Sequence, residues 1–200
     1  MPLLDIPDVF IGSTDDGHSF VVINRRIPAA DRLLTDAGFF AREHLGRTLY
    51  LLPPGTAQDA HERAGDAMYG LLAHTHDFVD LSWTTRWRPG TPEADPDLRF
   101  QFTNATVTAT AQTSAARSLL EQHGFARAAD GSSYQPLPGL EQRSLLGAVT
   151  AAETHAYTLG LTVRVGLGIP TPMDIPAAPG RASAVAPRPP SAPAARRRPR

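Results

Sequence analysis

The 200-residue chain has a formal charge of -1, but residues 1–170 hold 13 Arg against 19 Asp plus Glu (-6), whereas residues 171–200 hold six Arg against one Asp (+5). It has no Cys, which excludes disulfides, thiolate metal sites and a cysteine nucleophile. The start of the chain lacks the basic flank and apolar core of a secretion signal, and no stretch approaches the roughly 20 apolar residues that span a bilayer. A cytoplasmic protein without membrane insertion is therefore expected.

A repeated pattern runs through the sequence. Residues 29–55 and 115–139 each contain a helix-forming run with a Leu-Leu pair, then a Gly-Phe pair, a polar stretch, a Tyr, and finally Leu-Pro and a Gly. Glycine directly after a helix can adopt the left-handed conformation that closes the last turn, and the following Phe can pack back onto that turn. The repeat predicts an internal duplication into two similar lobes.

The first lobe, residues 1–87, is predicted to contain four strands and two helices. Apolar runs and turn residues place strands at 9–11, 19–23, 48–52 and 78–83. One helix follows Pro28 and ends at Gly38, and a second begins at Thr56 with a capping-box pattern. The predicted core face of this second helix is Ala60, Ala64, Ala67, Met68 and Leu71.

Residues 88–97 are rich in proline and have no apolar periodicity, so they are predicted to link the lobes. The second lobe, 98–169, repeats the order, with strands at 98–102, 106–111, around Tyr134 and at 161–165. Its helices are expected from a cap at Ser114 to Gly124, and along the apolar stripe Leu145, Val149, Ala152, Ala156 and Leu159. Each lobe is thus predicted to be an α+β unit with two helices on one face of a small sheet.

From residue 170 the composition changes to Pro, Ala, Ser and Arg, with few large apolar side chains. Such a segment buries too little surface to offset its ordering entropy, so residues 170–200 are predicted to be a disordered tail. Its terminal cations, Arg196, Arg197, Arg198 and Arg200, form a dense positive charge that could contact nucleic acid or an acidic protein.

No catalytic, cofactor or metal site is predicted. His74 and His76 beside Asp77 could bind zinc on an extended segment, but a polar helix end, where the helix dipole favours His, is the preferred interpretation, because no third ligand is evident. Asp15 and Asp16 with His18 could bind a cation, yet Asp-Asp-Gly is favoured in a hairpin turn for its geometry alone. No phosphate loop, dinucleotide fingerprint or nucleophile elbow is present, which argues against an enzyme.

Trp83, Arg86, Trp87 and Arg88 cluster at the end of the first lobe. Aromatic rings and guanidinium groups in alternation could stack on single-stranded nucleic acid, or the two Trp rings could fill the seam between the lobes. The acidic body favours the seam.

The sequence therefore predicts a non-enzymatic binding or regulatory protein whose basic tail contacts nucleic acid or an acidic partner. The alternative is a small-molecule-binding or enzymatic domain with its pocket between the lobes. Converging polar groups in a deep pocket at the seam would favour this alternative, and a flat or filled seam would favour the binding protein.

Overall fold

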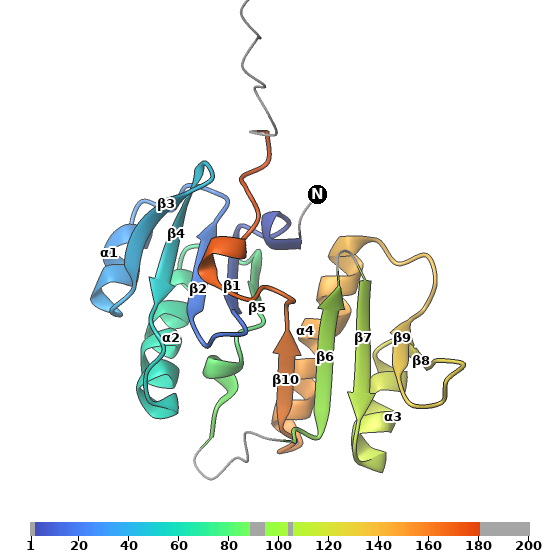
Figure 1. The fold of residues 1–200 in the computed structure, drawn as a ribbon. Helices are drawn as coiled ribbons and strands as arrows, with labels where there is room; N and C mark the ends of the chain where they lie inside the picture. The colour runs from blue at the N-terminus through green and yellow to red at the C-terminus, as the bar shows by residue number, and fades with distance from the viewer. Residues whose placement is uncertain (1–2, 89–94, 104–105, 181–200) are drawn as a thin grey trace, which may run out of the picture.

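The computed structural model describes residues 3–88, 95–103 and 106–180. Within these ranges the predicted α+β class is confirmed, with four α-helices and two separate five-stranded sheets. Figure 1 shows the two sheets side by side. The first is formed by residues 9–80 and the second by residues 98–166, and we refer to these regions with their helices as the first and second halves.

The first sheet has the strand order β3-β4-β2-β1-β5. Only the pair of β1 with β5 is parallel among its four strand pairs. Its strands are β1 (Val9–Ser13), β2 (Ser19–Ile23), β3 (Phe40–His44), β4 (Arg47–Leu52) and β5 (Phe78–Asp80). Helix α1 (Ala30–Asp36) lies between β2 and β3 in the chain, and α2 (Ala57–Leu72) lies between β4 and β5.

The second sheet has the order β10-β6-β7-β9-β8, again with one parallel pair, β6 with β10. Read from the other edge, this order matches that of the first sheet strand for strand. The strands are β6 (Leu98–Thr103), β7 (Thr106–Ala111), β8 (Phe125–Arg127), β9 (Tyr134–Pro136) and β10 (Val163–Gly166). Helices α3 (Ser114–Gln122) and α4 (Gln142–Thr158) occupy the places of α1 and α2.

The expectation of four strands in each lobe is wrong, because β3 and β8 were not predicted. Both are edge strands, and four of the five residues of β3 are exposed. An edge strand that faces solvent lacks the apolar alternation by which a strand is recognised. The β3–β4 hairpin turns at Leu45 and Gly46, which have φ of 45° and 87°; two successive positive φ angles are typical of a tight type I′ turn.

Other boundaries also differ from the prediction. The strand expected at 78–83 ends at Asp80 and is followed by a 3-10 helix, η2 (Trp83–Arg86). Thr113, not Ser114, caps α3, because its hydroxyl accepts a hydrogen bond from the Ala116 amide. Leu159 is exposed rather than part of the α4 core stripe. The Thr56 cap of α2 is confirmed, since its hydroxyl accepts from the Asp59 amide at 3.2 Å.

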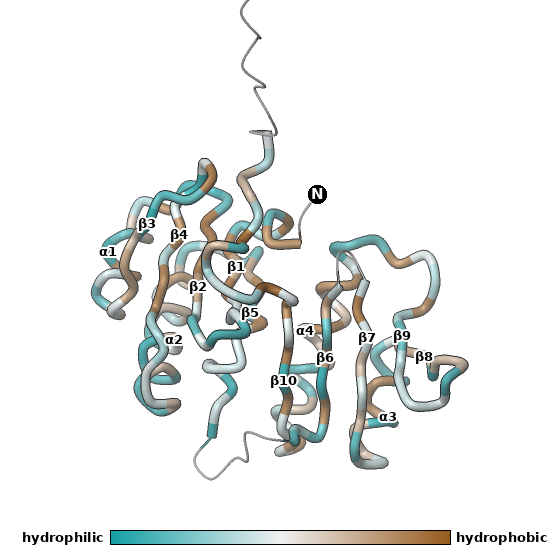
Figure 2. Tube along the Cα trace, in the orientation of Figure 1, coloured by the Kyte–Doolittle hydropathy of each residue, from teal (hydrophilic) through white to brown (hydrophobic). Residues whose placement is uncertain are grey.

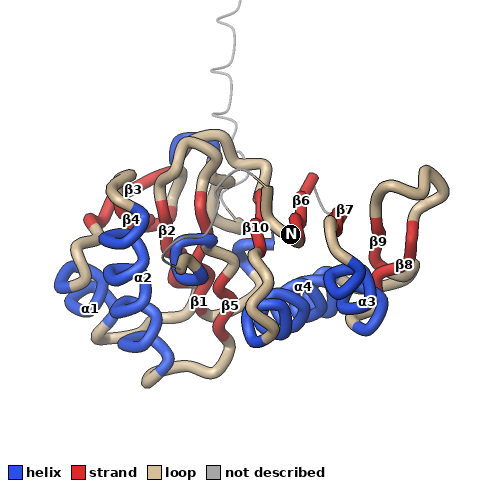
Figure 3. Tube along the Cα trace, turned by 90° about the horizontal axis from the view of Figure 1, so that it is seen from below, coloured by secondary structure: helices blue, strands red, loops and turns tan. Residues whose placement is uncertain are grey.

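The four helices form one layer on one side of the two sheets, in the order α1, α2, α4, α3 (Figure 3). Apolar side chains of α1 and α2 pack on Val9, Ile11 and Val21 of the first sheet. No helix in the described part of the chain is both long and apolar enough to cross a membrane.

The other face of the first sheet, which we call its outer face, is covered by the C-terminal strap, residues 167–179. Ile169 and Ile175 are buried there in the same cluster as Phe10 and Phe20. The strap includes a short 3-10 helix, η3 (Pro172–Asp174), and runs in front of the first sheet in Figure 1. The prediction of a disordered tail is therefore wrong for residues 170–180, which the structure describes. Residues 181–200 lie outside the described ranges.

Three glycines let the chain pass from the second half to the first. A Cβ on Gly12 would lie 2.6 Å from Leu167, so only glycine leaves room for the strap here. Gly168 has a φ of +66° and approaches the Phe102 carbonyl, while Gly166 lies against the Gln101 side chain. These glycines fix the path of the strap over β1.

The outer face of the second sheet is not covered by any described segment in the same way. Phe100, Phe102, Val107 and Ala109 point into the core, and the residues between them are polar and mostly exposed. Figure 2 shows hydrophobic and hydrophilic positions succeeding each other along β6. This alternation is expected for a sheet with one buried and one solvated face.

Candidate binding site between the two halves

The segment after β5 is held against the first sheet by hydroxyl groups. The Ser82 hydroxyl is 3.0 Å from that of Ser13, and the Thr84 hydroxyl is 3.1 Å from that of Ser19. The Thr85 hydroxyl donates to the Asp80 carboxylate at 2.6 Å. Short polar side chains thus hold η2 at the end of β1 and β2, and η2 in turn places Arg86 at the junction of the halves.

Three ionisable groups meet in the buried part of this junction. Arg86 Nη1 is 3.6 Å from Asp80 Oδ2, and Arg86 Nε is 3.8 Å from Glu153 Oε1. Asp80 and Arg86 belong to the first half, whereas Glu153 lies on α4. The Arg86 guanidinium therefore lies within 4 Å of two buried carboxyl groups, one from each half.

Burial determines the protonation of these carboxyl groups. Burial raises the pKa of Glu153 to about 8; Arg86 opposes the rise and Asp80 adds to it. Burial also raises the pKa of Asp80, against Arg86 and the hydrogen bonds from Thr85 and Ser82. With a pKa of about 8, Glu153 holds its proton at neutral pH and adds no negative charge to the buried junction.

On the helix side of the junction, α2 and α4 each present a stripe of side chains to the space between the halves. Two pockets lie there. One, of about 340 Å³, is lined by α2, η2 and Tyr157 of α4. The other, of about 510 Å³, is lined by Phe78 and Val79 of β5 and by Gly147, Ala151 and Thr154 of α4. We call this region the seam groove: residues Glu62, Gly65, Asp66, Tyr69, Phe78, Val79, Arg86, Gly147, Ala151, Thr154 and Tyr157.

The seam groove combines apolar walls with an acidic rim. Tyr69 is 73% exposed, Leu72 is 40% exposed and Tyr157 is 37% exposed. Leu72 lies three residues after Tyr69 and therefore shares its side of α2. Glu62 and Asp66, also exposed and four residues apart, add negative charge to this stripe. Such a surface suits a ligand with apolar groups and flanking cations.

The structure places all four candidate residues of the first half at this junction. Trp83 lies 4.5 Å from the Arg164 guanidinium, and the Trp87 ring is 5.9 Å from that of His61. Arg88 lies 3.9 Å from the centre of the Tyr157 ring and donates to the Tyr157 carbonyl at 2.5 Å. The contacts of Trp83 and Arg88 join the two halves, whereas the contact of Trp87 with His61 lies within the first half. The nucleic-acid role of the cluster stays a prediction. The terminal candidates, Arg196, Arg197, Arg198 and Arg200, lie outside the described residues.

Sequence reasoning missed Asp80 and Glu153. The signal for Glu153 was available, because it sits within the helical stripe of Val149, Ala152 and Ala156, all of which are buried. A carboxyl group in an apolar stripe is rarely buried without a partner. Asp80 carries no such signal, since it ends a short strand of mixed composition.

Asp16 and His18 lie in the turn between β1 and β2, where their side chains contact each other. The Asp16 carboxylate accepts from the Thr14 hydroxyl at 2.5 Å and lies 2.9 Å from His18 Nδ1. Burial alone would raise the pKa of Asp16, but the hydrogen bonds from Thr14 and His18 outweigh it and lower that pKa. Within the described ranges, no group of three or more His, Asp or Glu side chains is arranged to hold a metal ion.

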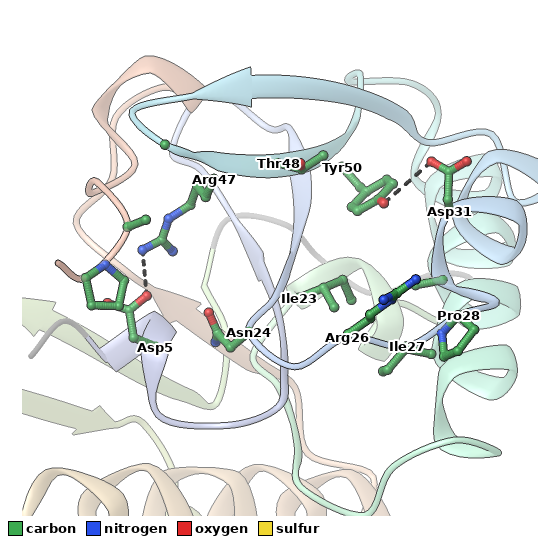
Figure 4. A pocket seen from close by; sticks show the side chains of 14 residues that line it. Asp5, Ile23, Asn24, Arg26, Ile27, Pro28, Asp31, Arg47, Thr48 and Tyr50 are labelled. Atoms are coloured by element: carbon green, nitrogen blue, oxygen red, sulfur yellow. Dashed lines mark hydrogen bonds and ion pairs between the residues drawn. The ribbon is translucent and has the colours of Figure 1, made fainter. Parts of the chain in front are cut away.

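A further pocket of about 510 Å³ lies at one end of the first sheet (Figure 4). On one side Arg47 donates to Asp5 at 2.6 Å, and on the other Tyr50 donates weakly to Asp31 at 3.5 Å. Burial and the nearby Asp31 charge raise the pKa of Tyr50. Arg47 also donates to the Ala177 carbonyl, so this ion pair helps to hold the strap.

Comparison with known proteins adds no relative: no family model matches the chain, and neither do any of the curated proteins or solved structures searched.

Proposed function

We propose that the protein is a non-enzymatic binding or regulatory protein whose seam groove receives an amphipathic helical segment of a protein partner. The observation that carries the proposal is the seam groove itself, which both halves line and where Tyr69 and Tyr157 stay exposed, with the exposed Leu72 one turn after Tyr69 on α2. Exposed apolar side chains that gather in a concave region are typical of a protein interaction site.

The dimensions and charge of the groove define the occupant. The α4 stripe runs from Gly147 to Tyr157, a length of about 15 Å at 1.5 Å per residue. This length matches about three turns of a bound helix whose apolar face enters the groove. Because Glu62 and Asp66 line the α2 side, the occupant should carry Lys or Arg beside its apolar face.

A small molecule is the second candidate ligand. The smaller pocket brings together His61, Arg86 and Tyr157, and His61 Nδ1 is fixed by the Thr84 carbonyl at 2.9 Å. Polar groups that converge in a pocket between two halves are what a small-molecule site requires. In that case the affinity for the small molecule would depend on the His61 side chain more than on Tyr69 or Leu72.

We also propose that the halves arose by internal duplication. Supporting this, the two sheets share one strand order and one parallel pair. Gly38 and Gly124, from the repeated sequence, have φ of 86° and 82°, and the Phe39 and Phe125 that follow are both buried. Superposition of residues 8–86 on residues 97–167 tests the proposal; it fails if the equivalent elements do not overlay in chain order.

The groove is tested with an amphipathic Leu/Lys helical peptide as the probe. Isotope-labelled full-length protein is titrated with this peptide, and amide shifts are expected to cluster on α2, α4 and β5. Replacing Tyr69 and Leu72 by Glu should weaken binding about tenfold or more. Phe40→Glu is the matched control, because Phe40 is 46% exposed on edge strand β3, outside the groove. An equal loss of peptide affinity in the Tyr69/Leu72 variant and in Phe40→Glu, or amide shifts outside α2, α4 and β5, would reject the groove. A loss of affinity only with His61→Ala would favour the small-molecule site.

A further inference from the structure

The first sheet opens at one end into the pocket of about 510 Å³ that Figure 4 shows. The last pair between β2 and β4 is Val22 with Leu49, whereas β4 continues along β3 to Arg47. Residues 23–24 and 47–48, where the two strands part, line the pocket. The pocket therefore lies in a gap between strands, and its volume is within the range of small-molecule sites, roughly 300–1,000 Å³. It shares no residue with the seam groove.

The inner end of this pocket holds a buried ion pair whose hydrogen-bonding capacity is not filled. Arg47 Nη2 donates to Asp5 Oδ1 at 2.6 Å and to the Ala177 carbonyl at 2.9 Å. The side chains of Arg47 and Asp5 are only 6% and 1% exposed. Within the described residues, Arg47 Nε, Arg47 Nη1 and Asp5 Oδ2 are nevertheless buried without a hydrogen-bond partner. Neighbouring unpaired donors and an unpaired acceptor suit a ligand group that both accepts and donates, such as a carboxamide.

The open end of the pocket is lined by one cation and one anion, Arg26 and Asp31, and both are exposed. Asp31 accepts only a weak hydrogen bond from the Tyr50 hydroxyl at 3.5 Å. Among the described residues, neither Arg26 nor Asp31 has an ion-pair partner. Figure 4 shows Tyr50 and Asp31 pointing toward each other, with Arg26 below them. A cation and an anion that line one pocket without pairing suit a ligand that carries both charges.

We propose that this pocket binds a free α-amino acid whose side chain carries a carboxamide. The carboxylate of the ligand lies at Arg26 and its ammonium group at Asp31, at the open end. Its side-chain carbonyl accepts from Arg47, and its side-chain amide donates to Asp5 Oδ2. The charged residues that line the pocket are two arginines and two aspartates, so a zwitterion without net charge is the matched ligand.

The strap closes the inner end of the pocket. Ala178 and Pro179 line it beside Arg47, and the Ala178 amide donates to the Leu45 carbonyl at 3.2 Å. Because the unpaired atoms of Arg47 and Asp5 are shielded from solvent, the carboxamide reaches them when the end of the strap shifts. Ligand binding should therefore weaken the hydrogen bond between Ala178 and Leu45.

A ligand with a single charge is less well matched to this pocket. An anion such as a phosphate would lie near Asp5 and Asp31 as well as near the two arginines, and a cation would lie near Arg26 and Arg47. In both cases like charges oppose the attraction of the opposite ones. Ligands with one charge therefore provide the discriminating comparison.

The test uses L-glutamine as the probe, titrated to millimolar concentrations into isotope-labelled full-length protein. Amide shifts are expected in residues 23–31 and 46–50 and at Ala178. N-acetyl-L-glutamine lacks the ammonium group and the α-amide of L-glutamine lacks the carboxylate, so each should bind about tenfold more weakly or worse. L-leucine keeps both charges but has no carboxamide, and it should also bind more weakly because the inner end stays unpaired.

Substitutions at the open end make the test specific without disturbing the buried ion pair. Arg26→Gln and Asp31→Asn should each reduce the affinity for L-glutamine about tenfold or more. Arg25→Gln and Asp36→Asn are the matched controls and should leave the affinity unchanged, because Arg25 pairs with Asp8 at 3.3 Å and Asp36 ends α1 outside the pocket. The proposal is overturned if L-glutamine does not bind, if any of the three analogues binds equally well, if the controls lose as much affinity, or if the shifts lie at the seam groove.

Discussion

Arg86 Nε and Glu153 Oε1 lie 3.8 Å apart across the junction of the two halves. The spacing exceeds a hydrogen bond, and Arg86 Nε and Glu153 Oε2 both remain buried without a hydrogen-bond partner in the described structure. A protonated Glu153 agrees with the long spacing, since a neutral acid does not require a close cation.

Stability should fall as pH rises from about 5 to about 8. The pKa of Glu153 is raised from its usual 4.5 to about 8, so in this window the folded chain keeps a proton that the unfolded chain has lost. The unfolded state then binds fewer protons, and the free energy of unfolding decreases with pH. Glu153→Gln should flatten this slope, measured by urea denaturation at several pH values. An unchanged slope in the variant would mean that Glu153 is ionised throughout.

Removal of the shared guanidinium should be costly. Arg86→Met leaves Asp80 buried without its cation, and such a loss destabilises by roughly 3–5 kcal/mol. Arg25→Met is the control, because Arg25 pairs with Asp8 at an exposed site and should change stability by less than about 1 kcal/mol. Chemical denaturation of both variants provides the measurement. Similar losses in the two proteins would show that burial of the Asp80 pair has no special importance.

The strap should contribute to the stability of the first half. Ile175→Ala removes an almost fully buried side chain and should cost about 2–4 kcal/mol. The neighbouring Met173→Ala, exposed on η3, should have little effect. Amide exchange would locate the change, with protection lost first in β1 and β2. A stability loss in the Met173 variant as large as that of Ile175 would contradict this role.

Removal of residues 181–200 should abolish any nucleic-acid binding by the tail and leave the fold intact. A chain ending at Gly180 keeps the strap and removes all six arginines of residues 171–200, leaving one Asp and no Arg after residue 170. Electrostatic binding to duplex or single-stranded DNA should then be lost, and in the full chain it should weaken steeply with salt. The comparison is made by anisotropy across a salt titration. Undiminished binding by the shortened chain would move attention to Trp83, Arg86, Trp87 and Arg88.

Gly180 is the appropriate end point for the shortened chain, because all six arginines of residues 171–200 follow it. A truncation at Pro170, the boundary that composition suggests, would remove Ile175 as well. It would therefore confuse loss of the tail with loss of the first sheet's cover.

Periodicity predicted the long buried elements well and the exposed ones poorly. The α2 residues Ala60, Ala64, Ala67 and Leu71 repeat at helical spacing and are all buried. Edge strand β3 has no comparable pattern, because most of its side chains face solvent. Proline content led to the wrong expectation for the strap, since a few well-placed apolar residues such as Ile175 suffice when another sheet supplies the surface. The seam groove depends on how the halves meet, which no local pattern specifies.

The path of the strap sets an order of events during synthesis. His44 in the first half receives its partner at Ile175, 131 residues later. Phe10 and Phe20 therefore leave the ribosome long before the segment that covers them, and contacts so distant in sequence form slowly. Until then the nascent first sheet presents an apolar surface that a chaperone can bind, and the release of that chaperone would be timed by the synthesis of the strap.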